Sequence, residues 1–218
     1  MSTGWTYHDP VFEHAADPAA SWAGHRRFGY DLVRNLRPRR LVELGVCLGT
    51  SFFAFCQAVK DGGLDTELVA VDTWEGDEHT GFYGPGYLEQ FNGVWRSRFP
   101  RLAVRQVKRP FDEARREVED ASVDLLHLDG LHTYESARHD YETWSESVRK
   151  GGVILFHDIA VRDDGRGFGT YRLWDELKAR FPTAEFAHSF GLGVLFTSDP
   201  PPDLDRLQDE WRRRYEGS

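Results

Sequence analysis

The sequence predicts an α/β protein: a seven-stranded, mostly parallel sheet with helices on both faces and the last strand antiparallel. The first observation is the alternation of short apolar segments with helical segments along the chain. The second is that polar residues stand at or near the C-terminal ends of the strands, namely Glu43, Asp72, Asp129, His157 and Asp158. Because ligands bind outside this edge of open α/β sheets, the second observation predicts a binding site as well as a fold.

The bulk composition predicts one globular domain over residues 1–218. The chain is 40% hydrophobic and 14% aromatic, which suits one core, and its 218 residues are too few for two domains of ordinary size. No apolar run is long enough to cross a membrane, and the first residues lack the basic and apolar pattern of a secretory signal.

Charge and cysteine content exclude further classes of protein. A formal net charge of −9 argues against a nucleic acid partner, because phosphate binding normally needs a basic face. The two cysteines, Cys47 and Cys56, form neither a metal-ligand set nor a disulfide framework. The expected location is therefore a reducing cytoplasm.

Residues 1–38 are predicted to form an N-terminal helical cap. Ser21 is a candidate N-cap for a helix over Trp22–Leu36, which ends before Pro38. The aromatic and basic side chains of this helix could cover a ligand cleft as a lid. Alternatively, the helix could pack at the edge of the sheet, and the sequence leaves both readings open.

The segment Arg40–Thr50 carries the clearest functional signal. A short apolar strand is followed by a turn with Gly45 and Gly49, and a buried helix follows over Thr50–Lys60. Glycine lets the backbone approach a ligand, and the helix N-terminus offers N–H groups, which together suit an adenosyl-type ligand. Asp72 ends a second strand about 20 residues beyond the turn, where a ribose-binding carboxylate is found in nucleotide-binding units.

The remaining elements follow in order. The glycine-rich loop Thr73–Gly86 borders the ligand edge and is predicted to contact the substrate. Beyond it we predict a helix, a strand and a helix over Tyr87–Phe99, Leu102–Val107 and Phe111–Glu119. Next come the central strand Val123–Asp129 and the helix Tyr134–Val148. A turn at Gly151 and Gly152 leads into the fifth strand, Val153–Asp158, and the charged loop Ile159–Gly169 follows it. A helix is predicted over Tyr171–Phe181, and the strands Glu185–His188 and Gly193–Thr197 follow it as a hairpin. The final predicted element is a C-terminal helix over residues 203–216.

Three polar positions are interpreted without a role at the site. His127 lies within an apolar strand and is expected to be a core histidine with its hydrogen bonds satisfied. His139 and Asp140 lie on a predicted helix and are expected to be solvated. The C-terminal helix is expected to pack on the domain or to join copies in a homo-oligomer.

Several motifs together resemble a known family. The run from Glu43 through Gly45 to Gly49, the acid Asp72 and the stretch LLHLDGLHTYESARHDYETWSESVRKGGVILFHD (125–158) resemble class I S-adenosylmethionine (SAM)-dependent methyltransferases. The likeness is closest to the small-molecule O-methyltransferase branch that includes macrocin-type sugar O-methyltransferases and cephalosporin-hydroxylase-like proteins. It covers residues 40–197, and it implies a Rossmann-like core, SAM as cofactor and a small-molecule acceptor, as in natural product biosynthesis.

The resemblance also implies roles in cofactor binding. Gly45 and Gly49 would surround the methionine part of SAM, and Glu43 would reach its amino end through the loop or a water. Asp72 would accept hydrogen bonds from the ribose hydroxyls. The full set that the resemblance implies for SAM is Glu43, Gly45, Gly49, Asp72, Thr73, Phe111, Asp112 and Asp129.

For the chemistry, the resemblance implies His132, Asp129 and His157 as catalytic residues. His132 stands three residues past Asp129, where related enzymes place a lysine base, and histidine suits this task by its intrinsic pKa. His79, Tyr83 and His132 would face the acceptor. Asp129, His157 and Asp158 match the ligand positions of metal-dependent members, but histidine replaces the usual acid before Asp158. Whether a divalent ion such as Mg²⁺ or Mn²⁺ is bound therefore stays open, as does a purely structural His157–Asp158 pair.

Other functions remain as alternatives to O-methylation. The acceptor could be a small amine, or the chain could bind SAM or a partner without catalysis. An NAD-dependent oxidoreductase would need G-x-G-x-x-G, and here those positions are Gly45, Cys47 and Thr50. A hydrolase or hydroxylase would need a nucleophile elbow or a facial triad of ligands, and the sequence shows neither.

Overall fold

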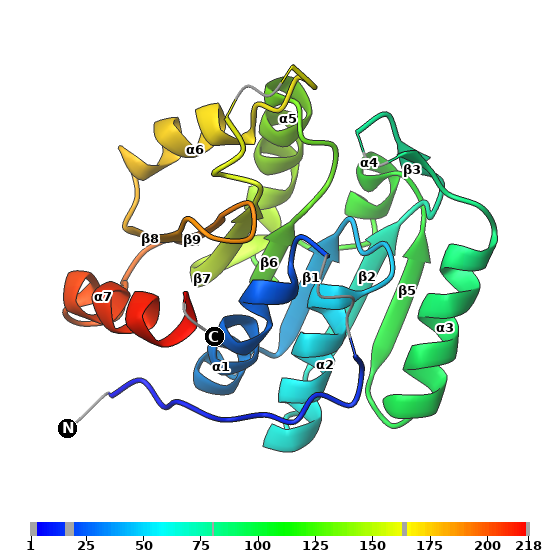
Figure 1. Ribbon diagram of the computed structural model, residues 1–218, viewed down its shortest axis with the longest axis horizontal. Helices are drawn as coiled ribbons and strands as arrows, with labels where there is room; N and C mark the ends of the chain where they lie inside the picture. Colours follow the sequence, from blue (N-terminus) through cyan, green and yellow to red (C-terminus); the bar gives the residue numbers. More distant parts are fainter. Residues whose placement is uncertain (1–3, 16–19, 80, 163–164, 217–218) are drawn as a thin grey trace.

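The computed structural model describes residues 4–15, 20–79, 81–162 and 165–216. Its main feature is a seven-stranded sheet with the strand order β5-β2-β1-β6-β7-β9-β8 (Figure 1). The neighbours from β5 to β7 pair in parallel, whereas β9 runs antiparallel to both β7 and β8. The predicted fold class, including the antiparallel last strand, is confirmed. The strands are β1 Arg40–Leu44, β2 Glu67–Asp72, β5 Val104–Lys108, β6 Val123–Leu128, β7 Val148–His157, β8 Thr183–Phe186 and β9 Leu192–Phe196.

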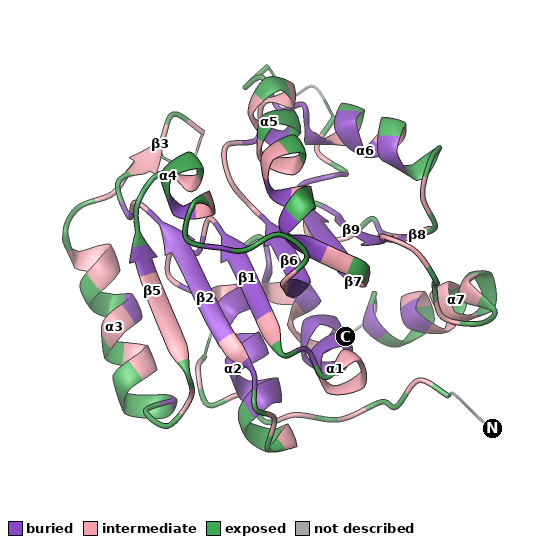
Figure 2. Ribbon diagram, turned by 180° about the vertical axis from the view of Figure 1, so that it is seen from behind, coloured by how far each residue is buried: buried purple, intermediate pink, exposed green. Residues whose placement is uncertain are grey.

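Helices cover both faces of the sheet and divide the core into two layers. The first layer is packed by α1 Arg26–Leu36, α2 Thr50–Gly62, α3 Gly86–Arg98 and α7 Leu204–Tyr215. The second is packed by α4 Phe111–Arg115, α5 Tyr134–Trp144 and α6 Thr170–Lys178. Alternate residues of the strands face the two layers, so that Leu41 lies in the first and Val42 in the second. The central strands are buried on both faces, as Figure 2 shows, which explains their nearly continuous apolar sequences.

Register brings the polar strand ends into one row. Leu44 pairs with Val71 on one side and with Leu128 on the other, and Leu128 pairs with Phe156. The residues that follow these pairs are Gly45, Asp72, Asp129 and His157, which therefore lie side by side at one edge of the sheet.

The predicted helix over Tyr134–Val148 is too long, and the turn after it is wrong. The α-helix ends at Trp144, a short 3₁₀ turn follows over Ser145–Ser147, and β7 already begins at Val148. Gly151 has a φ of +77°, and the pairing of β6 with β7 shifts register at this level. The two glycines therefore form an irregularity inside a long strand, because glycine supplies the positive φ that a bulge requires.

Three smaller predictions also differ from the structure. The helix predicted to reach Glu119 ends at Arg115. The loop predicted after Asp72 contains a small hairpin of β3 Gly76–Asp77 and β4 Gly81–Phe82. Ser21 caps no helix, since a 3₁₀ turn over Ala23–His25 precedes α1 and its N-cap is Trp22.

The first described residues of the chain lie along α1 and α7. The Trp5 indole donates a hydrogen bond to the Tyr215 hydroxyl at 3.2 Å, and its ring packs on Trp211 at 4.5 Å between centroids. The Tyr215 hydroxyl in turn donates to the buried Asp31. Within the predicted cap of residues 1–38, the segment around Trp5 thus lies against the C-terminal helix, and α1 is packed against the sheet, whereas residues 1–3 and 16–19 lie outside the described part of the chain. Among the described residues, no helix is long and apolar enough to span a membrane.

Candidate functional site

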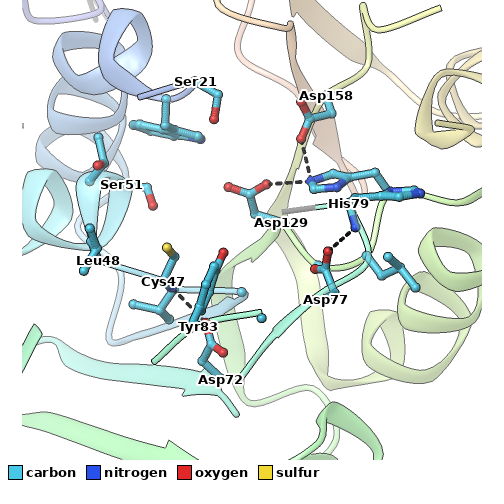
Figure 3. A pocket seen from close by; sticks show the side chains of 18 of the residues that line it. Ser21, Cys47, Leu48, Ser51, Asp72, Asp77, His79, Tyr83, Asp129 and Asp158 are labelled. Carbon is cyan, nitrogen blue, oxygen red and sulfur yellow. Dashed lines mark hydrogen bonds and ion pairs between the residues drawn. The ribbon is translucent and has the colours of Figure 1, made fainter. Parts of the chain in front are cut away.

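A cavity of about 540 Å³ lies at the C-terminal edge of β1, β2, β6 and β7. Its walls come from the glycine turn, the loops after β2, β6 and β7, and the segment before α1. Figure 3 shows Ser21, Cys47, Leu48 and Ser51 along one side of this cavity, and Asp129, Asp158 and His79 along the other. The predicted residues that line it are Gly45, Gly49, Asp72, Thr73, His79, Tyr83, Phe111, Asp129, His132 and Asp158.

The glycine turn requires its glycines. Gly45 has a φ of +84°, and a Cβ there would lie 1.9 Å from the backbone oxygen of Asp129. Gly49 has a φ of +83° and is the N-cap of α2, where a Cβ would lie 2.6 Å from the Phe53 ring. A glycine N-cap has no side chain to bond the first N–H groups of α2, so the helix N-terminus is free to receive a ligand.

Asp72 joins the end of β2 to the glycine turn. Its carboxylate accepts hydrogen bonds from the backbone N–H groups of Cys47 at 2.8 Å and Trp74 at 2.7 Å. The Trp74 indole also donates to the Cys47 carbonyl at 2.9 Å. Burial raises the pKa of Asp72, and these backbone donors offset part of that shift. The carboxylate lines the cavity, so its remaining lone pairs can accept hydrogen bonds from a ligand.

Glu43 does not line the cavity. It is fully buried behind Ser51, whose hydroxyl donates a hydrogen bond to the Glu43 carboxylate. Burial raises the pKa of Glu43, and the nearby His127 and Ser51 act in the opposite direction. The predicted contact of Glu43 with a cofactor can therefore be made only through Ser51 or a water.

Asp129, His132 and Asp158 converge at the opposite side of the cavity. The Nε2 atom of His132 lies 2.8 Å from Asp158 Oδ2 and 3.6 Å from Asp129 Oδ1. One donor atom from each of the three residues lies within 4.8 Å of the other two. Burial alone would lower the pKa of His132, but the two carboxylates outweigh it and raise the pKa to about 9. The cluster can hold a proton on His132 or a divalent cation between the three side chains.

His157 lies behind this cluster and outside the lining of the cavity. Its Nδ1 atom is 3.2 Å from Asp129 Oδ1 and 3.0 Å from Asp158 Oδ2, and its Nε2 atom is 3.1 Å from the Ser189 carbonyl. Both ring nitrogens are thus engaged by protein oxygens. The geometry therefore groups His132, and not His157, with the two carboxylates as a donor set that faces the cavity.

The loop Thr73–Gly86, which is predicted to contact a substrate, meets the charged loop Ile159–Gly169 beside His132. The ring of Phe168 lies nearly parallel to His132 and His79, with centroids 4.8 Å and 4.9 Å apart. The backbone N–H of His79 donates to Asp77 at 2.7 Å, which closes the turn of the small hairpin. Tyr83 also lines the cavity and stacks on Tyr87 at 4.2 Å. Both predicted acceptor-side residues of this loop thus reach the cavity wall.

Asp112 and Asp140 do not lie where the sequence analysis places them. Asp112 lies at the surface, 2.8 Å from the exposed His139, and does not line the cavity, whereas Phe111 does. Asp140 was expected to be solvated, and this expectation is wrong. Its carboxylate packs near Gly130 and Phe111, and burial raises its pKa to about 7.

Several lining residues were not identified from the sequence as site residues. Cys47 stands in the turn between Gly45 and Gly49, but a lone cysteine there gives no signal of a ligand contact. Trp22 belongs to the segment predicted as a lid, whose aromatic content was the only available signal. Phe168, Arg166 and Phe190 lie in loops without a transferable pattern.

Comparison with known sequences identifies the family. A family model described as "Methyltransferase domain" matches residues 42–159. An uncharacterized protein, y4gI, of Sinorhizobium fredii is 46% identical over 185 residues, which is 84% of this chain. The chain spans only 20% of the length of that relative.

Comparison with solved structures supports the same fold. The SAH-bound methyltransferase PaMTH1 of Podospora anserina has a TM-score of 0.62 at 16% identity, covering 80% of this chain and 78% of its own. An O-methyltransferase of Bacillus cereus in complex with SAH has a TM-score of 0.58 at 16% identity, covering 85% and 84%. TomG of Streptomyces achromogenes, an O-methyltransferase in complex with SAM, has a TM-score of 0.56 at 18% identity, covering 84% and 92%. The family model covers more than half of the chain, so the chain belongs to the methyltransferase domain family, as the resemblance in its sequence predicted.

Proposed function

We propose that the chain transfers the methyl group of SAM to a hydroxyl oxygen of a polar small molecule, such as a sugar or another natural product. The observation that supports this proposal is the position of the cluster Asp129, His132 and Asp158. It faces the same cavity as the glycine turn and Asp72, so a donor and an acceptor can meet between them.

The residues on one side of the cavity fit SAM. The turn at Gly45 and Gly49 leaves no room for a Cβ, as expected where backbone approaches a ligand closely. The N–H groups at the start of α2 suit the carboxylate of the methionine part, and Asp72 suits the ribose hydroxyls. When bound, SAM supplies a methyl group on a positively charged sulfur, which an oxygen can attack in line. The protein contributes mainly alignment of the two reactants.

On the other side, His132 and the two carboxylates orient and deprotonate the acceptor. An alcohol is a poor nucleophile, so removal of its proton assists the attack. With a pKa raised to about 9, His132 carries a proton at neutral pH and accepts another group's proton only after losing its own. A divalent cation at this cluster would compete with that proton, and it would supply positive charge that favours the alkoxide.

Asp72→Ala is expected to raise the Kd for SAM by at least about tenfold, because the variant loses both ligand and turn contacts. Calorimetric titration of the full chain with SAM, and with NAD as the competing class of ligand, measures this effect. Asp209→Ala on the exposed face of α7 is the matched control and should bind SAM like the wild type. Heat from NAD with none from SAM would contradict the proposed cofactor.

Titration of the chain with Mn²⁺ near neutral pH is expected to release about one proton per ion, because the cation displaces the proton of His132. Calorimetry in two buffers with different ionisation enthalpies measures the proton count. Asp158→Asn should weaken binding by at least about tenfold, since one carboxylate ligand is lost. Binding that releases no proton would exclude His132 as a ligand and leave it the role of base.

A further inference from the structure

A buried polar chain runs behind the cofactor side of the cavity, from Trp22 through His127 and Glu43 to Ser51. The Trp22 indole donates to His127 Nε2 at 3.1 Å, and His127 Nδ1 lies 3.3 Å from Glu43 Oε1. Ser51 donates to the same Glu43 oxygen. Both ends of the chain, Trp22 and Ser51, line the cavity, whereas its two middle members are fully buried.

The direction of each contact follows from the chemistry of its donor. An indole nitrogen can only donate, so His127 Nε2 must accept and the imidazole proton stands on Nδ1. This nitrogen lies 3.3 Å from Oε1 of the Glu43 carboxylate, which also accepts a hydrogen bond from the Ser51 hydroxyl. His127 is therefore the acceptor that allows the indole N–H of Trp22 to be buried, a role beyond that of a core histidine.

Packing makes the position of Trp22 depend on this acceptor. The indole lies edge-on to Phe55 of α2 and to His127 of β6, with ring centroids 5.5 Å and 5.3 Å apart. It also covers Gly29 of α1, where a Cβ would lie 2.6 Å from the indole ring. Trp22 is only 2% exposed, so without His127 its N–H would be buried and unpaired.

Residues 20–22 form part of the cavity wall, and Figure 3 shows Ser21 and Ser51 on the same side of the cavity. We propose that His127 is a positioning residue that holds the Trp22 indole, and with it residues 20–22, as a wall of the cofactor site. The inference rests on the proposed function, because the wall is assigned to SAM. It makes the segment before α1 a part of SAM binding, although it is far from the glycine turn in the sequence.

The test compares SAM and SAH titrations of the full chain with thermal unfolding of the same variants. His127→Leu removes the acceptor and keeps an apolar side chain of similar size, and it should raise the Kd for SAM by about tenfold. His127→Gln keeps an acceptor for the indole and should restore most of the affinity. Trp22→Phe removes the donor, so adding His127→Leu to it should cost less affinity than His127→Leu costs alone.

Trp144→Phe is the matched control for a lost indole. Trp144 is fully buried in the other core layer and does not line the cavity. This variant should lower the unfolding temperature and leave the Kd for SAM unchanged. Folded His127→Leu and Trp22→Phe proteins that bind SAM like the wild type would overturn the inference and leave the proposed function intact. Should His127→Leu fail to fold, the Kd of folded Trp22→Phe for SAM still tests the inference, because an unchanged Kd would show that the indole is not part of the cofactor site. A wild-type protein that does not bind SAM would overturn both proposals.

Discussion

Gly45→Ala is expected to raise the Kd for SAM at least about a hundredfold and to lower the unfolding temperature by several degrees. The added Cβ would lie 1.9 Å from the backbone oxygen of Asp129, and a backbone atom cannot move aside as a flexible side chain can. The left-handed φ of +84° adds about 1–2 kcal/mol for any residue with a Cβ. Relief of the clash must separate the ends of β1 and β6, which carry the two sides of the cavity. Calorimetry with SAM and thermal unfolding measure the two effects.

Gly63→Ala is the matched control for this prediction. Gly63 also has a positive φ, of +55°, and it caps the C-terminus of α2, but a Cβ there would meet nothing within 4 Å. Its replacement should lower the free energy of unfolding by about 1 kcal/mol, because alanine adopts a positive φ less readily than glycine, and it should not change the Kd for SAM. Equal losses of affinity in the two variants would show that the contact with Asp129 is not the cause.

Asp140→Asn is expected to stabilise the protein at about pH 8 and to change its stability little near pH 4. Burial raises the pKa of Asp140 from 3.8 to about 7, with His139 lowering and Asp112 raising it further. The neutral acid is therefore preferred in the folded state, and wild-type stability falls as the pH rises from 3.8 through about 7. Asparagine cannot ionise and avoids this loss. The gain above pH 7 should be about 2 kcal/mol, roughly half the value for a fully buried group with this shift.

The measurement is denaturant unfolding of wild type and variant at several pH values, because the titration of groups that do not interact with Asp140 cancels in the difference. Asp209→Asn, at an exposed site on α7, should show a difference near zero at every pH. A stability difference for Asp140→Asn that does not change across this range would refute the buried-acid interpretation.

The sheet and most helices could be predicted because their sequences carry strong local patterns. Buried parallel strands read as apolar runs, and glycine or proline marks where each run ends. The hairpin of β3 and β4 escaped prediction because strands of two residues have no period to detect. Gly151 and Gly152 were misread because paired glycines have the same local signature in a turn as in a strand irregularity.

The candidate site was predictable at the level of the sheet edge and less so at the level of single side chains. Strand register alone places Asp72 and Asp129 next to the glycine turn. Whether His132 or His157 faces the cavity depends on where β7 ends and how the loop after β6 folds. The spacing of these residues in the sequence determines neither. The burial of Asp140 likewise depends on the contact of α5 with Phe111, which is a tertiary feature.

β9 comes last in sequence among the strands of the described residues, and it is an inner strand of the sheet, between β7 and β8. During synthesis, β7 keeps an open hydrogen-bonding edge and β8 has no neighbour until residues 192–196 have left the ribosome. An open edge of an apolar strand is a template for pairing with another chain. Final assembly of this sheet therefore waits for the synthesis of β9, and a chain cut short before Leu192 would present the edge of β7 to aggregation or to chaperones.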